Sequence, residues 1–439
     1  MFSNLSPVGR LKVDNYNLRK RDLVIVLAIS LAFLMSFSGT FALAQDENVT
    51  ITYWDIMTNP SKTRWRKNMV DAFNELYPNI TVKTSYFPFD DYFTKLESSF
   101  AGGNAPDVMA IDAPNVPRRV EVDDVLLELD KYFAEQKNDF IDASMEEATW
   151  KGKFYAVPMY QSSQAIFYNK DMFEDAGIDP PEKVENAWTW EHFVEVAQKL
   201  QVTEDGETKV WGLVIDQWDR PYQIDAFLDS KGAELIGPDK ETTDGYLNSP
   251  EAIEALEFYS NLFNKWEIAP KDPLPEAFGN GRAAMWLTGP WWISGMKSDY
   301  PDINFGVMPL PYFKDGKKAS PSGSWHLGIY NETDHPKAAA KFVAHLTDWS
   351  GGDLNFQVTR YLPTRKETYR IHEESLGTPP ESVFAEQLRD TASPRPRLPE
   401  YRSFENILRG AYRDIALGAD PEERINQAVR RIDRQLERG

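Results

Sequence analysis

The chain has 439 residues, of which 42% are hydrophobic and 26% are charged, and its formal net charge is -20 at pH 7. This length suffices for two or three domains, and the acidic balance argues against binding to nucleic acid or to an anionic membrane surface. Cysteine is absent, which excludes disulfides, thiolate metal sites, cysteine nucleophiles and lipidated cysteines.

The first 44 residues predict a signal peptide for export. A basic cluster at residues 19–21 precedes an apolar run at residues 23–37, and Ala42 and Ala44 supply the small side chains that a signal peptidase cleaves after. The run is shorter than the roughly 20 residues of a membrane-spanning helix. We therefore expect the mature chain to begin near Gln45, with an uncleaved membrane anchor as the alternative. Because no cysteine is present for acylation, the sequence favours a free periplasmic protein.

The mature chain begins with alternating strands and helices. Apolar alternation predicts strands at residues 49–54, 80–86 and 108–111, and helical spacing of apolar residues predicts helices at 62–77 and 92–100. This order predicts a parallel sheet covered by helices, with a ligand at the carboxyl ends of the strands.

A second α/β unit follows, and we expect it to be wound through the first. Residues 304–311 are extended and contain prolines, which indicates a crossing between two lobes. The remaining expected elements are strands at residues 210–215 and 283–288 and helices at 190–200, 224–231, 250–266, 336–347 and 421–437. The predicted fold class is therefore α/β with two lobes.

No motif in the sequence marks an enzyme. The five histidines contain no i, i+4 pair and no HExxH, and neither a GxSxG nucleophile motif nor a phosphate-binding glycine loop is present. We therefore expect no catalytic residue, no metal and no cofactor. Paired carboxylates are the exception, because two of them at a suitable separation hydrolyse glycosides. A secreted glycoside hydrolase stays open as an alternative.

Aromatic residues beside polar ones are the strongest functional signal. A sugar ring has apolar faces and a rim of hydroxyls, so its site needs flat rings together with carboxylates, amides and arginine. The candidate rings at expected strand ends and loops are Trp54, Trp218, Tyr222, Trp291, Trp292 and Trp325. The candidate polar groups are Asp55, Asp112, Gln161, Ser163 and Arg220. A binding protein for a polyamine or an iron chelate is a further alternative, since an acidic aromatic box or a tyrosine cluster would serve those ligands.

Nine motifs in a fixed order carry a family resemblance. They are residues 49–54, 101–108 (AGGNAPDV), 151–158 (KGKFYAVP), 167–173 (FYNKDMF), 188–193 (WTWEHF), 279–291 (GNGRAAM followed by GPW), 307–311 (VMPLP), 335–339 (HPKAA) and 361–365 (YLPTR). In this order the chain resembles the extracellular solute-binding proteins of ABC importers, in particular the sugar-binding group that includes maltose- and trehalose-binding proteins.

The resemblance implies a two-lobe, type II periplasmic-binding-protein fold with a ligand cleft between the lobes. It places residues 45–160 and 312–365 in the N-terminal lobe and residues 161–311 and 366–439 in the C-terminal lobe. The implied function is binding of a mono- or oligosaccharide or a related polyol by lobe closure, and its delivery to the membrane permease. The protein is expected to act as a monomer.

Site residues carry over from the family motifs one by one. Asp112 corresponds to the carboxylate that binds sugar hydroxyls, Trp291 to the stacking tryptophan and Tyr222 to an aromatic cleft position. Trp54, Asp55 and Trp325 match cleft positions on the first strand and a late loop, and Arg397 begins a C-terminal cleft segment, residues 397–408. Many relatives have an acidic residue within residues 159–166, where this chain has neutral amides and hydroxyls, and this departure puts a disaccharide preference in doubt.

Overall fold

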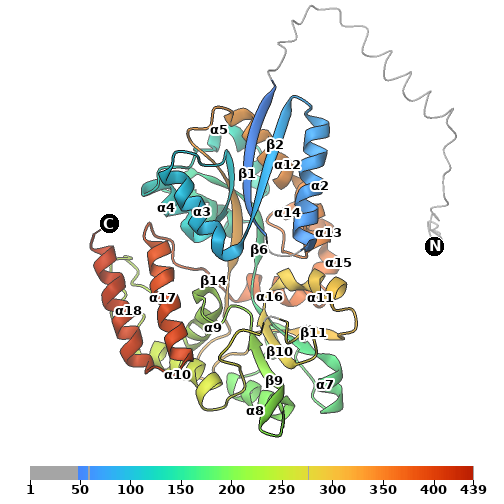
Figure 1. The fold of residues 1–439 in the computed structure, drawn as a ribbon, viewed down its shortest axis with the longest axis vertical. Helices are drawn as coiled ribbons and strands as arrows, with labels where there is room; N and C mark the ends of the chain where they lie inside the picture. Colours follow the sequence, from blue (N-terminus) through green and yellow to red (C-terminus); the bar gives the residue numbers. More distant parts are fainter. Residues whose placement is uncertain (1–47, 58–59, 275, 439) are drawn as a thin grey trace, which may run out of the picture. The chain divides into compact units, whose positions relative to one another are not determined.

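Two five-stranded sheets organise the chain in the computed structural model, which describes residues 48–57, 60–274 and 276–438 (Figure 1). We call the first sheet and the helices packed on it the N-terminal lobe, and the second sheet with its helices the C-terminal lobe. The predicted signal peptide, residues 1–44, lies outside the described residues. No helix among the described residues is both long enough and apolar enough to cross a membrane.

The N-terminal lobe contains a mixed sheet with strand order β2-β1-β3-β13-β6. Its strands are β1 (Val49–Met57), β2 (Ile80–Pro88), β3 (Val108–Asp112), β6 (Ala156–Ser162) and β13 (Gly323–Ile329). β1 pairs in parallel with β2 and β3, as the alternating strands and helices predict, whereas β13 runs antiparallel to both β3 and β6. The main helices of this lobe are α2 (Pro60–Leu76), α3 (Phe89–Ala101), α12 (Pro336–Thr347) and α13 (Trp349–Thr359).

The C-terminal lobe contains a sheet with strand order β11-β7-β10-β9-β8. Its strands are β7 (Ala165–Asn169), β8 (Val202–Glu204), β9 (Glu207–Ile215), β10 (Ala283–Thr288) and β11 (Phe305–Met308). Its main helices are α8 (Trp190–Leu200), α9 (Pro221–Lys231), α10 (Pro250–Asn264), α17 (Tyr401–Ala416) and α18 (Pro421–Leu436). The last two lie side by side and end the chain (Figure 1).

Shorter elements complete the two lobes. They are α4 (Val116–Glu121), α5 (Asp130–Phe133), α6 (Asp142–Ala148), β4 (Thr149–Trp150), β5 (Lys153–Phe154), α7 (Lys170–Asp175), α11 (Ile293–Asp299), β12 (Ser320–Pro321), α14 (Lys366–Ile371), α15 (Glu373–Leu376), α16 (Glu381–Asp390) and β14 (Ala392–Ser393), with 3₁₀ turns η1 (Ala113–Asn115), η2 (Gln136–Asp139), η3 (Val184–Asn186) and η4 (Pro290–Trp292).

The chain passes between the lobes at two short connections that differ from the predicted crossing, and it passes once more between α13 and α17. It leaves the first sheet between β6 and β7 and returns between β12 and β13. Residues 304–311 were expected to cross between lobes, but Phe305–Met308 form β11, an edge strand that pairs antiparallel with β7. Phe313, which the sequence assigns to the N-terminal lobe, packs in the core of the C-terminal lobe. The lobe boundaries given above stay a prediction.

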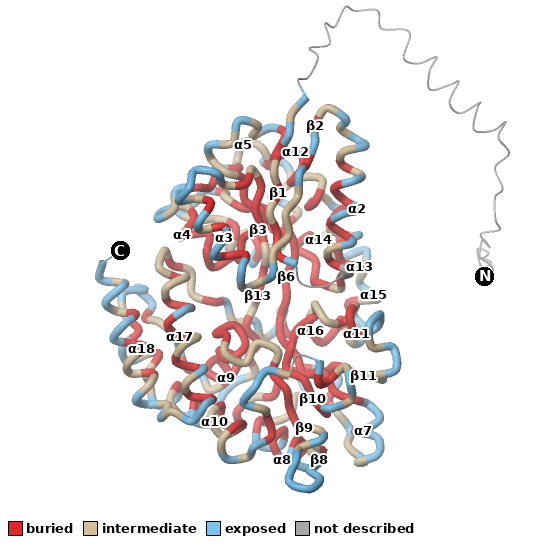
Figure 2. The backbone as a smooth tube through the Cα atoms, in the orientation of Figure 1, coloured by how far each residue is buried: buried red, intermediate tan, exposed pale blue. Residues whose placement is uncertain are grey.

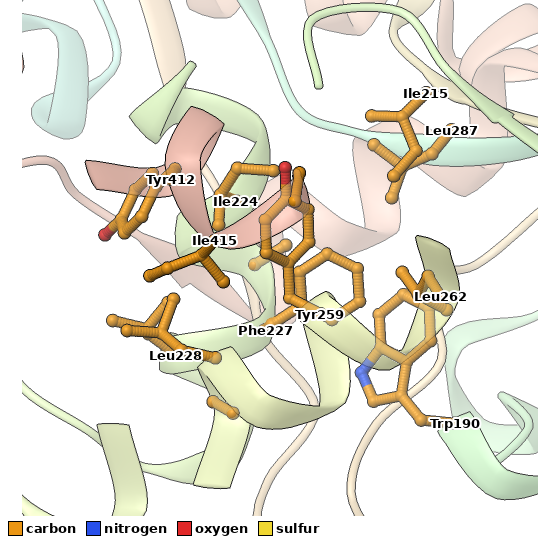
Figure 3. Close-up of a cluster of buried hydrophobic side chains, with 14 of the residues drawn as sticks. Trp190, Ile215, Ile224, Phe227, Leu228, Tyr259, Leu262, Leu287, Tyr412 and Ile415 are labelled. Atoms are coloured by element: carbon orange, nitrogen blue, oxygen red, sulfur yellow. The ribbon is translucent and has the colours of Figure 1, made fainter. Parts of the chain in front are cut away.

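Separate apolar cores stabilise the two lobes. Every residue of β3, β6, β7 and β10 is buried, as the red segments in Figure 2 show. Figure 3 shows the core of the C-terminal lobe, where Trp190, Phe227 and Tyr259 pack among aliphatic residues of α9, α10 and α17. Packing of α8 against β9 is so close that a Cβ on Gly212 would clash with the carbonyl oxygen of Ala197.

Two buried carboxyls lie on α9 of this lobe. Burial raises the pKa of Asp225 well above its ordinary value, and the neighbouring charge of Asp229 raises it further. Burial also raises the pKa of Asp229 to about 7, although a hydrogen bond with Ser393 and the charge of Lys317 oppose it. Both side chains are therefore more readily protonated than solvated aspartates.

Candidate functional site

A cavity of about 80 Å³ is lined by residues of both lobes. It contains five of the predicted site residues: Asp112 and Trp325 from the N-terminal lobe, and Arg220, Tyr222 and Trp291 from the C-terminal lobe. The strand-end argument explains Asp112, which is the last residue of β3. The sequence did not predict the other lining residues as ligand contacts. They are Ile56, Phe89, Ser162, Gln217, Gly323, Tyr361, Arg395 and Glu405.

An ion pair between Asp112 and Arg395 forms the polar centre of the cavity. Arg395 Nη1 donates to Asp112 Oδ2 at 2.9 Å and Nη2 donates to Oδ1 at 2.5 Å, and both side chains are buried. Burial alone would lower the pKa of Arg395, but the charge of Asp112 raises it well above the ordinary value. A carboxylate has about four lone-pair sites, so Asp112 keeps acceptor capacity for a ligand hydroxyl.

Trp325 forms an aromatic wall on the side of the N-terminal lobe. It lies on β13 directly opposite Asp112 of β3. Its ring packs edge-on against Phe89, with centroids 6.1 Å apart, and is tilted against Phe93 at the same separation. The wall is therefore fixed by side chains of α3, whose first residue is Phe89.

Trp291 forms the facing aromatic surface in the C-terminal lobe. Its ring lies 6.2 Å from the ring of Tyr222, and its Nε1 donates to Asp216 Oδ2 at 3.0 Å. The ring occupies the place of a side chain at residue 289, since a Cβ on Gly289 would clash with it. This close approach explains the Gly-Pro-Trp order at the end of β10. Burial raises the pKa of Asp216, against hydrogen bonds from Trp291, Thr288 and Trp292.

Arg220 and Tyr222 reach the cavity from the start of α9. The guanidinium carbon of Arg220 lies 4.5 Å from the ring centroid of Phe89, which is a cation–π contact between the lobes. The hydroxyls of Tyr222 and Ser162 lie 3.1 Å apart. Gly323 makes room for both, because a Cβ there would lie 2.7 Å from Ser162 Oγ.

Lys62 is buried among aromatic rings beside the cavity. Its Nζ is 4.5 Å from the ring centroid of Tyr160, 5.1 Å from that of Tyr361 and 5.9 Å from that of Trp325. Burial lowers the pKa of Lys62 well below its ordinary value, and the charge of Arg66 acts in the same direction. Three aromatic rings thus surround the amine of Lys62, and two of them, Tyr361 and Trp325, also line the cavity.

Asp55 was expected in the site, but the structure places it in the interior of the N-terminal lobe. It forms a fully buried ion pair with Arg66 of α2, accepts a hydrogen bond from the hydroxyl of Tyr53, and accepts another from the backbone N–H of Ile56 at 2.7 Å. Contacts within the protein therefore occupy its carboxylate. The neighbouring residue on β1, Ile56, lines the cavity instead, as the alternation of side chains along a strand requires.

Three predicted tryptophans also lie outside the cavity lining. The ring of Trp54 packs against Phe87, with centroids 4.9 Å apart, and Trp218 packs against Phe263 at 6.2 Å. Trp292 packs against Trp286 at 5.0 Å. Each of the three thus contributes to packing within its own lobe.

The remaining predicted residues make contacts within the protein. Gln161 Nε2 donates to Ser144 Oγ at 2.8 Å, and Ser163 Oγ donates to the carbonyl of Phe384 at 3.1 Å. Arg397 donates to the carbonyl of Glu147 at 3.2 Å. These three lie near the connections between the lobes and do not line the cavity.

The site has the composition of a binding site for a polar ring. It combines aromatic rings, two carboxylates and two guanidinium groups with few aliphatic side chains. Among residues 48–57, 60–274 and 276–438, no group of three or more histidine and acidic side chains is arranged to hold a metal ion.

Comparison with known proteins identifies the family. The family model described as bacterial extracellular solute-binding protein matches residues 59–348. The galactooligosaccharide-binding protein of Bacillus subtilis is 22% identical over 94% of this chain and 96% of its own. Among solved structures, the ABC substrate-binding protein Lmo0181 of Listeria monocytogenes, in complex with cycloalternan, is 24% identical, with a TM-score of 0.79 over 89% of this chain and 100% of that one. A solute-binding protein from Thermotoga lettingae, bound with alpha-D-tagatose, is 25% identical, with a TM-score of 0.79 over 88% and 99%. These folds confirm the predicted two-lobe α/β architecture, and the chain belongs to the bacterial extracellular solute-binding proteins.

Proposed function

We propose that this protein binds a carbohydrate outside the cytoplasm and delivers it to an ABC importer. The observation that carries the proposal is the cavity between the lobes, where Trp291, Tyr222 and Trp325 surround the Asp112–Arg395 pair. Aromatic faces cover the apolar faces of a sugar ring, and charged groups make strong hydrogen bonds to its hydroxyls. Relatives named for galactooligosaccharides and arabinooligosaccharides support the ligand class.

Ligand binding would act by bridging the lobes. A sugar that contacts Asp112 and Trp325 on one side and Trp291 and Arg220 on the other gains its full set of contacts only when the lobes meet, and so favours that arrangement. The membrane permease would then recognise the surface formed by the two joined lobes. We further propose that the protein is a monomer of the periplasm, exported by the N-terminal signal and then released by cleavage.

The experiment is a titration of the full chain with a panel of sugars and sugar alcohols, followed by tryptophan fluorescence and by thermal unfolding. A saturable fluorescence change with a raised melting temperature is expected for at least one member of the panel. Stabilisation by spermidine or an iron chelate, with no response to any sugar, would refute the carbohydrate assignment. Turnover of a chromogenic glycoside would indicate a hydrolase instead.

A further inference from the structure

One face of α3 forms two bridges to the C-terminal lobe beside the cavity. Phe89, Phe93 and Glu97 are spaced four residues apart and therefore lie along one side of the helix. Arg220 covers Phe89 at 4.5 Å, and the guanidinium carbon of Arg402 lies 4.5 Å from the ring centroid of Phe93. Arg402 Nε also lies 3.9 Å from Glu97 Oε1. We call these contacts the α3 bridges.

The α3 bridges form part of the cavity wall. Phe89 and Arg220 line the cavity directly. Phe93 packs behind the lining residues Phe89 and Trp325, with ring centroids 5.4 Å and 6.1 Å away. A ligand that extended out of the cavity on this side would have to separate the two arginines from α3.

Arg402 connects α3 to a residue that lines the cavity. It donates to Glu405 Oε2 at 2.8 Å, and Glu405 lines the cavity one helical turn further along α17. The charge of Glu405 is thereby balanced by Arg402, as that of Asp112 is balanced by Arg395. Paired charges of this kind favour a neutral ligand, because a charged ligand would compete with one member of each pair.

In this arrangement of the lobes, the volume of the cavity fits a small ligand. At roughly 10–15 Å³ for each water, about 80 Å³ corresponds to about five to eight waters, or roughly 150–240 Å³ of liquid water. One sugar ring with its hydroxyls displaces water on that scale. Each further ring of an oligosaccharide would need a subsite outside the present lining.

We propose that the cleft takes one neutral sugar ring, and that the α3 bridges exclude longer oligosaccharides. This inference rests on the proposed function and narrows it to monosaccharides and polyols of similar size. It sets the chain apart from the relatives named for oligosaccharides. Arg402 is then a residue that determines specificity from the cavity rim.

The test compares the affinities of the full chain for sugars of different length by isothermal titration calorimetry. The panel holds neutral hexoses and pentoses together with di- and trisaccharides built from them. We expect at least one monosaccharide to bind and the matching trisaccharide to bind at least 100-fold more weakly. A trisaccharide that binds within threefold of its monosaccharide, or oligosaccharides that bind while monosaccharides do not, would overturn the size limit alone. If no sugar of any length binds, the proposed function fails and this inference fails with it.

A matched pair of variants on α17 tests the bridges themselves. Arg402→Ala opens the bridge to Phe93 and Glu97, and we expect the disaccharide-to-monosaccharide affinity ratio to rise at least tenfold. Arg409→Ala is the control, because Arg409 is on the same helix but forms an ion pair with Asp219 at 2.9 Å and does not line the cavity. Its ratio should match that of the wild type. If Arg402→Ala also leaves the ratio unchanged in a protein that unfolds cooperatively, the bridges have no role in selecting ligand length. Phe89→Ala, which opens the neighbouring bridge, should raise the ratio in the same direction.

Discussion

Neutralising Asp55 is expected to destabilise the protein while leaving its ligand affinity intact. Asp55 and Arg66 are both fully buried, so Asp55→Asn leaves the Arg66 guanidinium without its counter-charge in the interior. Removing one partner of a buried ion pair costs about 3–5 kcal/mol. An unfolding entropy of about 2.1 cal/mol/K per residue gives about 0.8 kcal/mol/K for residues 48–439, so the melting temperature should fall by about 4–6 °C.

Calorimetric unfolding and sugar titration of the same samples check this expectation. The double variant Asp55→Asn/Arg66→Met is the control, because it removes both charges while the amide that replaces the carboxylate still offers an oxygen to Tyr53 and Ile56. It should recover most of the lost melting temperature. An unchanged melting temperature in Asp55→Asn, or a large loss of sugar affinity without any loss of stability, would refute the structural role of Asp55 and return it to the binding site.

Variants at other positions test further parts of the structure. Trp291→Ala should weaken sugar binding by about 1–3 kcal/mol, or roughly 5- to 150-fold, whereas Trp292→Phe should leave the affinity unchanged. Calorimetric titration of both variants measures the difference, and equal effects would contradict the placement of Trp291 in the binding site. The pKa of Asp229 is raised to about 7, so the folded state holds this proton more tightly than the unfolded chain does. The unfolding free energy should therefore fall by roughly 3 kcal/mol as the pH rises from about 4 to 7. Urea unfolding at several pH values should show that Asp229→Asn lacks this part of the slope, and parallel curves would disprove it. Gly212→Ala should lower the unfolding free energy by about 1–3 kcal/mol, because its Cβ would clash with a backbone carbonyl. Gly410→Ala on helix α17 should raise the unfolding free energy by about 0.5–1 kcal/mol, because its Cβ would meet no neighbour within 4 Å. A urea midpoint that moves in the opposite direction in either variant would show that the local packing differs.

Periodicity in the sequence predicted the long regular elements of the fold. The expected bounds of α8, α12 and β10 agree with the structure to the residue, since caps, prolines and apolar spacing are all local signals. Residues 304–311 show where local signals fail. Their prolines suggested a crossing, but whether an extended segment crosses or joins a sheet edge depends on the distant strand β7.

Site residues could be predicted from the sequence where the position of a residue on a strand determines which way its side chain points. Asp112 ends a buried strand and reaches the cavity, but Asp55 is withdrawn from it by Arg66, a residue with no distinguishing mark in the sequence. Arg395 was missed because its partner Asp112 lies 283 residues away along the chain. The pairing arises because the C-terminal segment returns to the end of β3. No local pattern in residues 391–400 predicts this return.

The position of β13 has a consequence for the synthesis of the protein. This strand lies between β3 and β6, so the first sheet lacks its connection to β6 until residue 329 has left the ribosome. At about 5–20 residues per second, that takes roughly 15–65 s. During this interval the N-terminal half has only its β1, β2 and β3 pairings available and cannot complete its core. The interlaced topology therefore delays completion of the N-terminal lobe until most of the chain has been made.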